Sequence, residues 1–404
     1  MDIIMVPFHD CKKWIGDGFR TRDAHLAEHF CTDSRVGKIL VINRPTSLAE
    51  SIIKQKKWKT SKLSHQIQVI QSDNRYEVGK LNEKLYYLDT FLPDFVKVIR
   101  ERKLWWFSAF QEKYILESIK RAIGKLELRN VVLLLQNPMA VGVIGFMEYD
   151  CLAFDAIDNW IHHPQMKSNH KIIEKNYKIV ENKADVIFTV SKALMNVFKE
   201  NQNVHWVANG VDVSYFSTAI KYRHIDEIVT IGYVGKIQDR VDFELVERCL
   251  KEYKNMKFIF VGPIFSQAKK IKKIQRNNNN IKFLGDIHYA DLPNVLKKID
   301  VAIMPHKIDA FTDSMNPLKL YEYLASGKPV VSTTVAGTEN ISEYIFLADD
   351  LEFVKKLGMV CAKVRNGEIS PLEVVESIPE ECTWDFRTSE ILNELEKVLP
   401  KGRY

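Results

Sequence analysis

The sequence lacks any apolar run close to the ~18 residues needed to cross a bilayer. It also lacks a cleavable leader pattern, because the acidic Asp2 follows Met1 directly and the chain soon reaches His9 and Asp10. None of the six cysteines forms a Cys-x-x-Cys pair, which argues against a zinc or dithiol site. We therefore expect a cytoplasmic protein with reduced thiols, either free or peripheral on the inner face of the membrane.

The chain has 404 residues, of which 46% are hydrophobic and 27% are charged. This length is too great for one ordinary domain and suits two, and the composition is that of a globular protein. Two cores of this size need neither disulfides nor metals for stability.

Charge is unevenly distributed between the two halves. The part up to Gly210 holds 31 Lys and Arg against 24 Asp and Glu, whereas the remainder holds 27 against 28. A basic first half suggests contact with something anionic, such as nucleic acid, a membrane face or a phosphorylated acceptor, although a lysine-rich surface kept for solubility is an alternative. Because no nucleic-acid-binding motif is present, we expect no nucleic acid partner.

Short β-branched runs alternate with longer amphipathic stretches through both halves. Alternating β and α units predict an α/β fold with parallel sheets and right-handed crossovers, here two Rossmann-like domains of about six strands each. The predicted strands are Ile3–Val6, Lys38–Ile42, Gln66–Val69, Val131–Gln136, Cys151–Asp155, Val186–Val190, Thr230–Val234, Lys257–Val261, Ile281–Phe283, Val301–Met304, Pro329–Ser332 and Tyr344–Leu347.

Turn residues cluster at Asn209-Gly210-Val211-Asp212 and mark the domain boundary. We therefore predict an N-terminal domain at 1–212 and a C-terminal domain at 213–383. The tail, 384–404, should contain an amphipathic helix that crosses back onto the first domain.

The most informative segment is 314–331, which predicts a helix followed by a strand. Ser314 or Asn316 can cap the helix, Pro317 suits its first turn, and Gly327 ends it. The strand before it would deliver the helix start to the carboxyl edge of the sheet, where open α/β sheets bind ligands.

A helix start at that edge offers free N–H groups and a positive dipole end to a phosphate. Lys319 adds a positive charge in the first turn, and Glu322 lies three residues further on the same face, where a carboxylate can accept bonds from ribose hydroxyls. A surface Lys–Glu pair is the alternative interpretation. The Gly235-Lys236 turn after another predicted strand would let the backbone approach a diphosphate, with Lys236 or Arg240 neutralising it.

The string 314–331 resembles the donor-site motif of GT-B glycosyltransferases of group 1, around family 4, particularly bacterial exopolysaccharide and teichuronic-acid-type enzymes. Asn209-Gly210-Val211-Asp212, Ala184 to Ser191, Gly232 to Lys236 and Val261-Gly262-Pro263 are similar to further motifs of that family. Ser314 stands where the wider family has a second glutamate.

The resemblance implies two Rossmann-like domains facing across a cleft and a nucleotide-sugar donor, UDP- or GDP-linked, bound in the C-terminal half. It implies a glycan or lipid-linked acceptor and cell-surface polysaccharide synthesis, with no cofactor and no metal ion. The resemblance and the residue chemistry together predict these donor-binding residues: Gly16, Gly235, Lys236, Arg240, Gly262, Tyr289, Asn316, Lys319, Tyr321 and Glu322.

The acceptor side is predicted from one segment of the first half. Asp155, Asp158 and His162 follow a strand, and inverting transfer needs a general base for the acceptor hydroxyl, so these three are the predicted catalytic residues. Carboxylates three residues apart can also simply cap a loop. The segment 16–23, interpreted as a glycine loop with two arginines, could contact a diphosphate or a phosphorylated acceptor, although ordinary charges at a helix start are the alternative.

Two basic-aromatic stretches, 54–59 and 100–107, suit an anionic lipid interface, although partly buried aromatics among solvated lysines would look the same. Two further functions remain open from the sequence. One is a sugar-nucleotide epimerase or hydrolase on the same fold, and the other is a non-catalytic GT-B-like binding protein.

Overall fold

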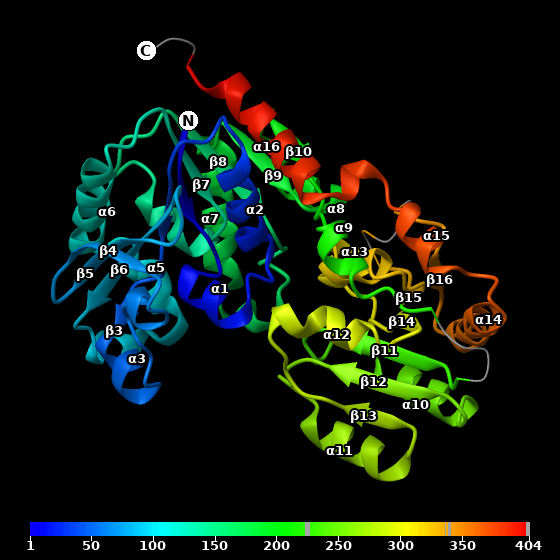
Figure 1. Cartoon of the computed structure of the whole chain (residues 1–404). Helices are drawn as coiled ribbons and strands as arrows, with labels where there is room; N and C mark the ends of the chain where they lie inside the picture. The colour runs from blue at the N-terminus through cyan, green and yellow to red at the C-terminus, as the bar shows by residue number, and fades with distance from the viewer. Residues whose placement is uncertain (223–226, 336, 338–340, 401–404) are drawn as a thin grey trace. The chain divides into compact units, whose positions relative to one another are not determined.

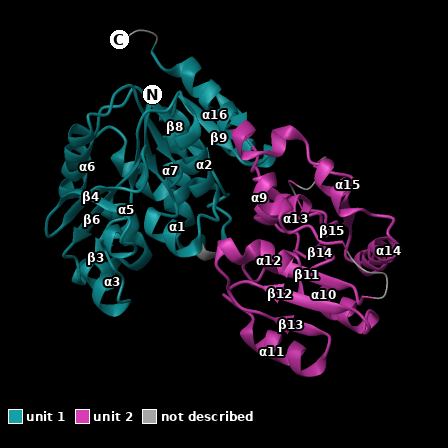
Figure 2. Cartoon of the chain, in the orientation of Figure 1, with its two compact units in different colours: residues 1–207, 388–404 teal, residues 208–387 magenta. Residues whose placement is uncertain are grey.

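The computed structural model describes residues 1–222, 227–335, 337 and 341–400, and it divides into two compact units (Figure 1, Figure 2). Unit 1 consists of residues 1–207 with 388–404, and unit 2 consists of residues 208–387. Residues 401–404 of the predicted tail segment lie outside the described residues.

The sheet of unit 1 has ten strands in the order β10-β9-β8-β7-β1-β2-β6-β5-β4, with β3 paired to β6. The central strands β1 and β7 are continuous apolar runs that are almost entirely buried, as expected for parallel strands covered on both faces. The strands of unit 1 are β1 (Asp2–Val6), β2 (Ile39–Ile42), β3 (Thr46–Ser47), β4 (Gln68–Ser72), β5 (Tyr76–Lys80), β6 (Leu85–Leu92), β7 (Val131–Leu135), β8 (Cys151–Ala156), β9 (Val186–Thr189) and β10 (Val204–Trp206).

The prediction of about six strands is wrong for this sheet, which carries an antiparallel edge. β5 pairs antiparallel with both β4 and β6, whereas β6 pairs parallel with β2. The pattern of β5 and β6 escaped the sequence analysis because buried polar side chains, Glu77 and Asp89, interrupt the apolar runs.

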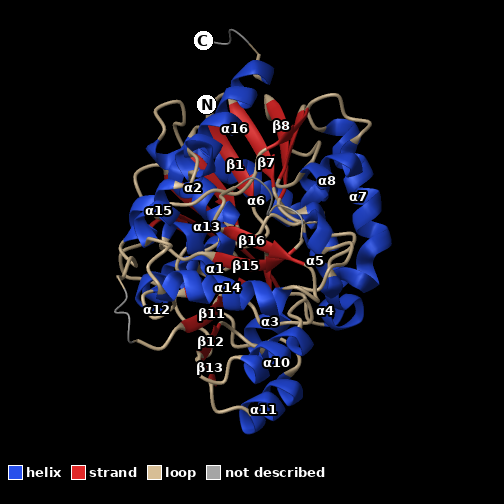
Figure 3. Cartoon of the chain, turned by 90° about the vertical axis from the view of Figure 1, so that its right-hand side faces the viewer, coloured by secondary structure: helices blue, strands red, loops and turns tan. Residues whose placement is uncertain are grey.

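Helices lie on both sides of β1 and β7 in Figure 3, where α2 and α7 flank the strands. This layering explains why both faces of the central strands are apolar. The helices of unit 1 are α1 (Cys11–Asp17), α2 (Arg22–Thr32), α3 (Leu48–Ile53), α4 (Val96–Glu101), α5 (Trp105–Ala109), α6 (Lys113–Leu126), α7 (His170–Lys183) and α8 (Lys192–Met195).

The sheet of unit 2 has six strands in the order β13-β12-β11-β14-β15-β16, and every pairing is parallel. All six had been predicted from the sequence to within a few residues. They are β11 (Thr230–Val234), β12 (Lys257–Val261), β13 (Ile281–Phe283), β14 (Val301–Met304), β15 (Val330–Thr333) and β16 (Ile345–Ala348). The helices are α9 (Val213–Ser217), α10 (Phe243–Glu252), α11 (Ala268–Asn277), α12 (Leu292–Leu296), α13 (Leu318–Ala325), α14 (Phe353–Arg365) and α15 (Pro371–Glu376).

The C-terminal helix α16 (Trp384–Val398) contacts the N-terminal region, as the sequence predicted. Arg35 donates hydrogen bonds to Asn393 at 2.6 Å and to Ser389 at 3.2 Å. His205 of β10 lies 3.6 Å from Glu394 of the same helix. The tail therefore joins the layer of helices that covers the first sheet.

Candidate functional site

The start of α13 lies after β14 in unit 2, and its first turn has no side-chain cap. Pro317 occupies the N-cap position and offers no hydrogen-bonding side chain. The prediction that Ser314 or Asn316 caps the helix is therefore wrong. The Ser314 hydroxyl donates to the Phe311 carbonyl at 2.9 Å, and the Asn316 side chain accepts from the backbone of Asn209 at 2.7 Å. Among the described residues, no side chain caps the first N–H groups of α13, as an anion site requires.

Lys319 is a buried cation that reaches from α13 to the end of β11. Its side chain is 9% exposed, and Nζ donates to the Tyr233 hydroxyl at 2.8 Å while lying 4.0 Å from the centre of that ring. A Cβ atom placed on Gly235 would lie 2.6 Å from Nζ. The glycine therefore leaves room for the ammonium group beside the backbone of the turn.

The charged ammonium form of Lys319 is destabilised in the protein without a ligand. Burial and the neighbouring Arg240 hold its pKa well below the usual value, and Glu322 opposes this effect only in part. Lys319 forms no salt bridge with any residue in the described part of the chain. A buried ammonium without a carboxylate partner is costly unless a ligand supplies the negative charge.

Two glycine turns pack against one another beside this lysine. Gly235 and Gly262 have φ of 138° and 134°, and a Cβ atom on Gly262 would lie 2.1 Å from the Gly235 carbonyl oxygen. The Gly262 N–H donates to the Gly285 carbonyl at 2.7 Å. Three turns, after β11, β12 and β13, are thereby held together at the carboxyl edge of the sheet, where open α/β sheets bind ligands.

Arg240 and Lys236 both lie near this edge of the sheet, but their side chains make different contacts. Arg240 contributes an Nη1 contact to Met315 Sδ at 3.7 Å, and its Nε is buried without a hydrogen-bond partner among the described residues. Lys236 is half-buried, and its Nζ lies 6.0 Å from the centre of the Phe265 ring. Arg240 therefore has donor capacity to spare next to Lys319, which favours it over Lys236 as the second cation of the site.

Glu322 is oriented by an aromatic pair. The Tyr289 hydroxyl donates to Glu322 Oε1 at 3.1 Å, and the Tyr289 ring stacks on Tyr215 at 5.9 Å between ring centres. The Tyr215 hydroxyl in turn donates to the Tyr289 carbonyl at 3.1 Å. Direct binding of the donor by Tyr289 stays a prediction, whereas its contact with Glu322 makes it a positioning residue.

Tyr321 and Asn316 support the site without facing a ligand. Tyr321 is 2% exposed, and its hydroxyl exchanges hydrogen bonds with the Asn316 side chain at 2.9 and 3.1 Å. The Asn209 side chain donates to the Asn316 carbonyl at 2.5 Å. These contacts fix the loop before α13, so we interpret both residues as structural supports of the helix start.

Asp155, the first predicted catalytic residue in unit 1, is fully engaged. It is buried at the end of β8 and accepts hydrogen bonds from Arg22 Nε and Nη2 at 2.9–3.1 Å and from Gln136 Nε2 at 2.8 Å. Both carboxylate oxygens of Asp155 therefore already accept hydrogen bonds from protein side chains. Its geometry favours an anchoring role for the Arg22 guanidinium.

The other predicted residues of unit 1 differ from Asp155 in their surroundings. Asp158 is half-buried and accepts the Tyr177 hydroxyl through its backbone carbonyl at 3.0 Å, and His162 is exposed. Gly16 lies inside α1, so the predicted glycine loop is confined to the few residues between α1 and α2. A Cβ atom on Gly16 would meet nothing within 4 Å.

A histidine–carboxylate pair at the end of β1 was missed by the sequence analysis. His9 Nδ1 lies 3.6 Å from Asp23 Oδ2, and the His9 backbone N–H donates to the same oxygen at 2.8 Å. Burial raises the pKa of Asp23, but hydrogen bonds from His9 and Thr21 outweigh it and keep the pKa below its usual value. An imidazole held by an ionised carboxylate can take a proton from a hydroxyl group.

Among the described residues, no group of three or more His, Cys, Asp or Glu side chains could hold a metal ion. In the same residues, every helix is too short or too polar to cross a membrane.

Residues 228–361 match the family described as glycosyl transferases group 1. This segment runs from β11 into α14 and contains every contact of Lys319 and Glu322 described above. Unit 2 carries a group 1 glycosyltransferase domain. The match confirms the resemblance drawn from the string 314–331.

One curated relative and two solved structures place this domain in context. The chain is 27% identical over 203 residues to TuaH of Bacillus subtilis (strain 168), named as a candidate teichuronic acid biosynthesis glycosyltransferase; the match spans 47% of the chain and 50% of TuaH. Sucrose-phosphate synthase from Thermosynechococcus elongatus superposes with a TM-score of 0.68 at 12% identity, covering 98% of this chain and 99% of that one. Anabaena Alr3699/HepE, solved with UDP and glucose, gives 0.62 at 13% identity over 98% and 100%.

The structural matches cover both units and show the GT-B fold. Two further residues of the glycosyltransferase domain escaped the sequence analysis, Tyr233 and His306. His306 is 1% exposed, its Nε2 lies 3.4 Å from the Tyr233 hydroxyl, and burial followed by Lys319 and Arg240 holds its pKa well below the usual value. His306 is therefore neutral and adds no third positive charge beside Lys319 and Arg240.

Proposed function

We propose that the protein transfers a sugar from a nucleotide-sugar donor, UDP- or GDP-linked, to a hydroxyl group of a glycan or lipid-linked acceptor. The observation that carries the proposal is the buried Lys319 ammonium, which lies beside the Gly235 turn and the uncapped start of α13 without a carboxylate partner among the described residues. A diphosphate supplies the charge and the acceptor oxygens that this edge lacks.

In this proposal the bond between the donor's anomeric carbon and its diphosphate breaks, the acceptor oxygen forms the new bond to that carbon, and the hydroxyl proton passes to a general base on the acceptor side. Lys319 and Arg240 stabilise the charge that develops on the leaving diphosphate, so the proposal needs no metal ion. Glu322, held by Tyr289, accepts hydrogen bonds from the ribose hydroxyls. Asp155, Asp158 and His162 remain predicted acceptor-side residues.

A role in cell-surface polysaccharide synthesis is supported by the name of TuaH, with which the chain shares about half its length. The sugar-nucleotide epimerase or hydrolase is the alternative on the same donor site. Transfer to an acceptor separates the two, since the alternative turns over the donor alone.

Glu322→Gln tests the donor site. We expect the wild-type protein to be stabilised in thermal unfolding by one class among UDP-, GDP- and dTDP-sugars, because a ligand that binds only the folded state raises the unfolding midpoint. Replacing Glu322 should weaken that nucleotide sugar about tenfold or more, through loss of charge-assisted hydrogen bonds. Glu252→Gln, an exposed change at the end of α10, should leave binding unchanged. Equal binding by both variants would remove Glu322 from the donor site.

We also propose that unit 1 rests on an anionic membrane surface on the cytoplasmic side. The helix α4 buries none of its residues: Val96 and Ile99 are 75% and 55% exposed, and the Arg100 side chain, which lies 3.5 Å from Glu101, is 74% exposed. Leu104, just beyond it, is 46% exposed. Exposed apolar side chains interspersed with cations suit the headgroup boundary of an anionic membrane.

Vesicle co-sedimentation tests this surface. The wild-type protein should bind phosphatidylglycerol-containing vesicles and release them as salt is raised, whereas phosphatidylcholine vesicles should bind weakly. Val96→Asp with Ile99→Asp should lower binding to the anionic vesicles about tenfold or more. Leu351→Asp is the matched control, because Leu351 is 84% exposed in unit 2. Unchanged binding of the double variant would contradict the assignment.

A further inference from the structure

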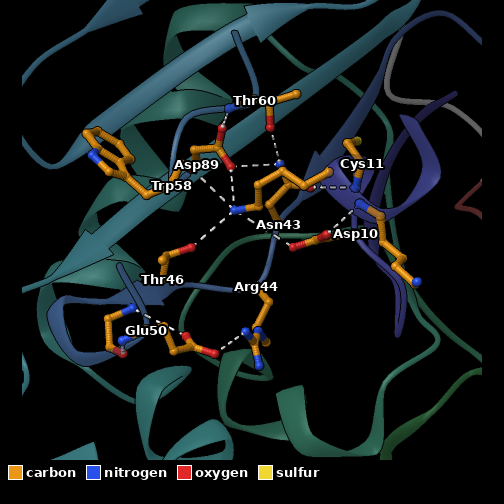
Figure 4. Close-up of polar contacts among 12 residues, drawn as sticks. Asp10, Cys11, Asn43, Arg44, Thr46, Glu50, Trp58, Thr60 and Asp89 are labelled. Carbon is orange, nitrogen blue, oxygen red and sulfur yellow. Dashed lines mark hydrogen bonds and ion pairs between the residues drawn. The ribbon is translucent and has the colours of Figure 1, made fainter. Parts of the chain in front are cut away.

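A second buried polar network lies in unit 1, at the carboxyl ends of β1 and β2. Its centre is Lys12 of α1, 8% exposed, whose Nζ donates to Asp89 at 3.0 Å, to Thr46 at 3.3 Å and to the Trp58 carbonyl at 3.3 Å. Figure 4 shows how Asn43 and Thr60 close this network around the Asp89 carboxylate. All three donors of the Lys12 ammonium are used, so this lysine has a structural role.

Arg44 is a second cation at the same edge, directly after β2. Its Nη2 donates to Glu50 Oε1 at 2.5 Å (Figure 4). Its guanidinium carbon lies 4.3 Å from the centre of the Trp106 ring. The Arg44 side chain is 14% exposed. Stacking on the indole and pairing with one carboxylate oxygen hold the guanidinium plane in a fixed orientation, which leaves part of its donor fork for another acceptor.

Lys56 is the third cation, and it lacks a partner. The side chain is half-buried, yet its ammonium makes no hydrogen bond or salt bridge with any residue in the described ranges. Its backbone N–H donates to the carbonyl oxygen of Glu50, the residue whose side chain pairs with Arg44, at 3.4 Å. Burial and the charge of Arg44 lower the pKa of Lys56 to about 8. A partly desolvated cation of this kind raises the free energy of the unliganded fold, and such perturbed groups are concentrated at functional sites.

The acidic groups near Lys56 are already engaged. Asp10, between β1 and α1, accepts from the Lys13 backbone N–H at 3.1 Å and lies 3.8 Å from Lys12. Glu50 of α3 is paired with Arg44. The groups that act on Lys56 are therefore Asp10, Lys12, Arg44 and Glu50, and every anion among them has another partner.

We infer that Arg44 and Lys56 form a binding site for an oxyanion carried by the acceptor, a phosphate or a sugar carboxylate. Its oxygens would accept hydrogen bonds from the Lys56 ammonium and from the free donors of Arg44. The place of the site, at the carboxyl edge of the sheet of unit 1, is where an open α/β sheet binds its ligand. The acceptor role rests on the proposed transfer reaction, whereas binding of the anion does not. The inference thus selects an anionic acceptor over a neutral glycan.

Acylation of lysines in the full-length protein tests the site without turnover. With a pKa of about 8, about half of Lys56 is unprotonated and reactive at pH 8. A bound oxyanion that raises this pKa by one unit lowers the reactive fraction to about a tenth, so labelling should slow about fivefold. Sulfate serves as the tetrahedral probe and glucuronate as the carboxylate probe, each compared with chloride at equal ionic strength, with labelling at each lysine followed by mass spectrometry.

Lys57 provides the internal control, because it is exposed and its ammonium contacts only the Lys62 carbonyl, at 3.3 Å. We expect sulfate or glucuronate to slow labelling at Lys56 and not at Lys57. Protection by sulfate indicates a phosphorylated acceptor, and protection by glucuronate indicates a uronic-acid-type acceptor. Arg44→Gln should abolish the protection and Arg44→Lys should retain part of it. Equal labelling of Lys56 in all three salts, or full protection in Arg44→Gln, overturns the inference. Neither result bears on nucleotide binding in unit 2, so failure here is distinct from failure of the proposed function.

Discussion

Lys319→Met is expected to weaken nucleotide-sugar binding at least about a hundredfold while leaving the free protein no less stable than wild type. The lost affinity corresponds to removal of a charge-assisted contact with the donor diphosphate in a water-poor site. Stability should not fall because the Lys319 ammonium is buried without a carboxylate partner among the described residues, and methionine fills a similar volume without the desolvation cost. Calorimetric titration with the donor and thermal unfolding without it measure the two effects.

The pH dependence of the free energy of unfolding shows whether the Lys319 charge stabilises or destabilises the fold. The pKa of Lys319 is lower in the folded protein than in the unfolded chain, so its protonated form opposes folding. As pH rises through the folded-state pKa towards about 10.4, this penalty disappears. Any stability advantage of Lys319→Met over wild type should therefore be largest near neutral pH and shrink on the alkaline side.

Lys328→Met is the matched control for that variant. Lys328 is also buried in unit 2, at 2% exposure, and burial lowers its pKa to about 8 against the opposing charge of Asp300. It follows α13 instead of starting it, so donor binding should survive its replacement. Equal loss of binding in the two variants would show that any buried cation matters, and would contradict a specific role for Lys319.

Gly262→Ala should destabilise the protein by about 3 kcal/mol or more and abolish donor binding. The new Cβ would lie 2.1 Å from the Gly235 carbonyl oxygen and 2.7 Å from its carbon, and the backbone has a φ of 134° that other residues rarely adopt. The obstructing atoms are main chain, so no side chain can rotate away, and the strain adds to the clash. Urea unfolding followed by circular dichroism measures the loss.

Substitutions at two other glycines distinguish the cost of the Cβ clash from the cost of the positive φ. Gly285 has a φ of 79° with open space around its Cα, so Gly285→Ala should cost only about 1–2 kcal/mol. Gly16 lies in α1 with nothing within 4 Å, so Gly16→Ala should stabilise the protein by about 0.5–1 kcal/mol. If Gly262→Ala cost no more than Gly285→Ala, the two turns would not pack as closely as described.

The donor side of the site could be predicted from the sequence because its main residues are local. Lys319 and Glu322 occupy one helix, and the strand and the glycine that bound that helix are contiguous with it. Gly235 and Gly262 each follow a strand whose apolar run is easily recognised. Parallel strands then bring these turns to one edge without further information.

The partners of these residues could not be predicted, since they depend on contacts between distant segments. Tyr233 meets Lys319 across 86 positions, and Tyr289 meets Glu322 across 33. In unit 1, Arg22 saturates Asp155 across 133 positions, which no local pattern reveals. The loop predicted at 16–23 is confined to residues 18–21, because Gly16 continues a helix that its residue type does not favour.

The most direct measurement is a crystal structure of the protein with the nucleoside diphosphate that binds most tightly in the thermal screen. We predict the diphosphate within about 3 Å of Lys319 Nζ and of the N–H groups that start α13, with the ribose hydroxyls on Glu322. A diphosphate bound elsewhere, with Lys319 still bonded only to Tyr233, would contradict the account.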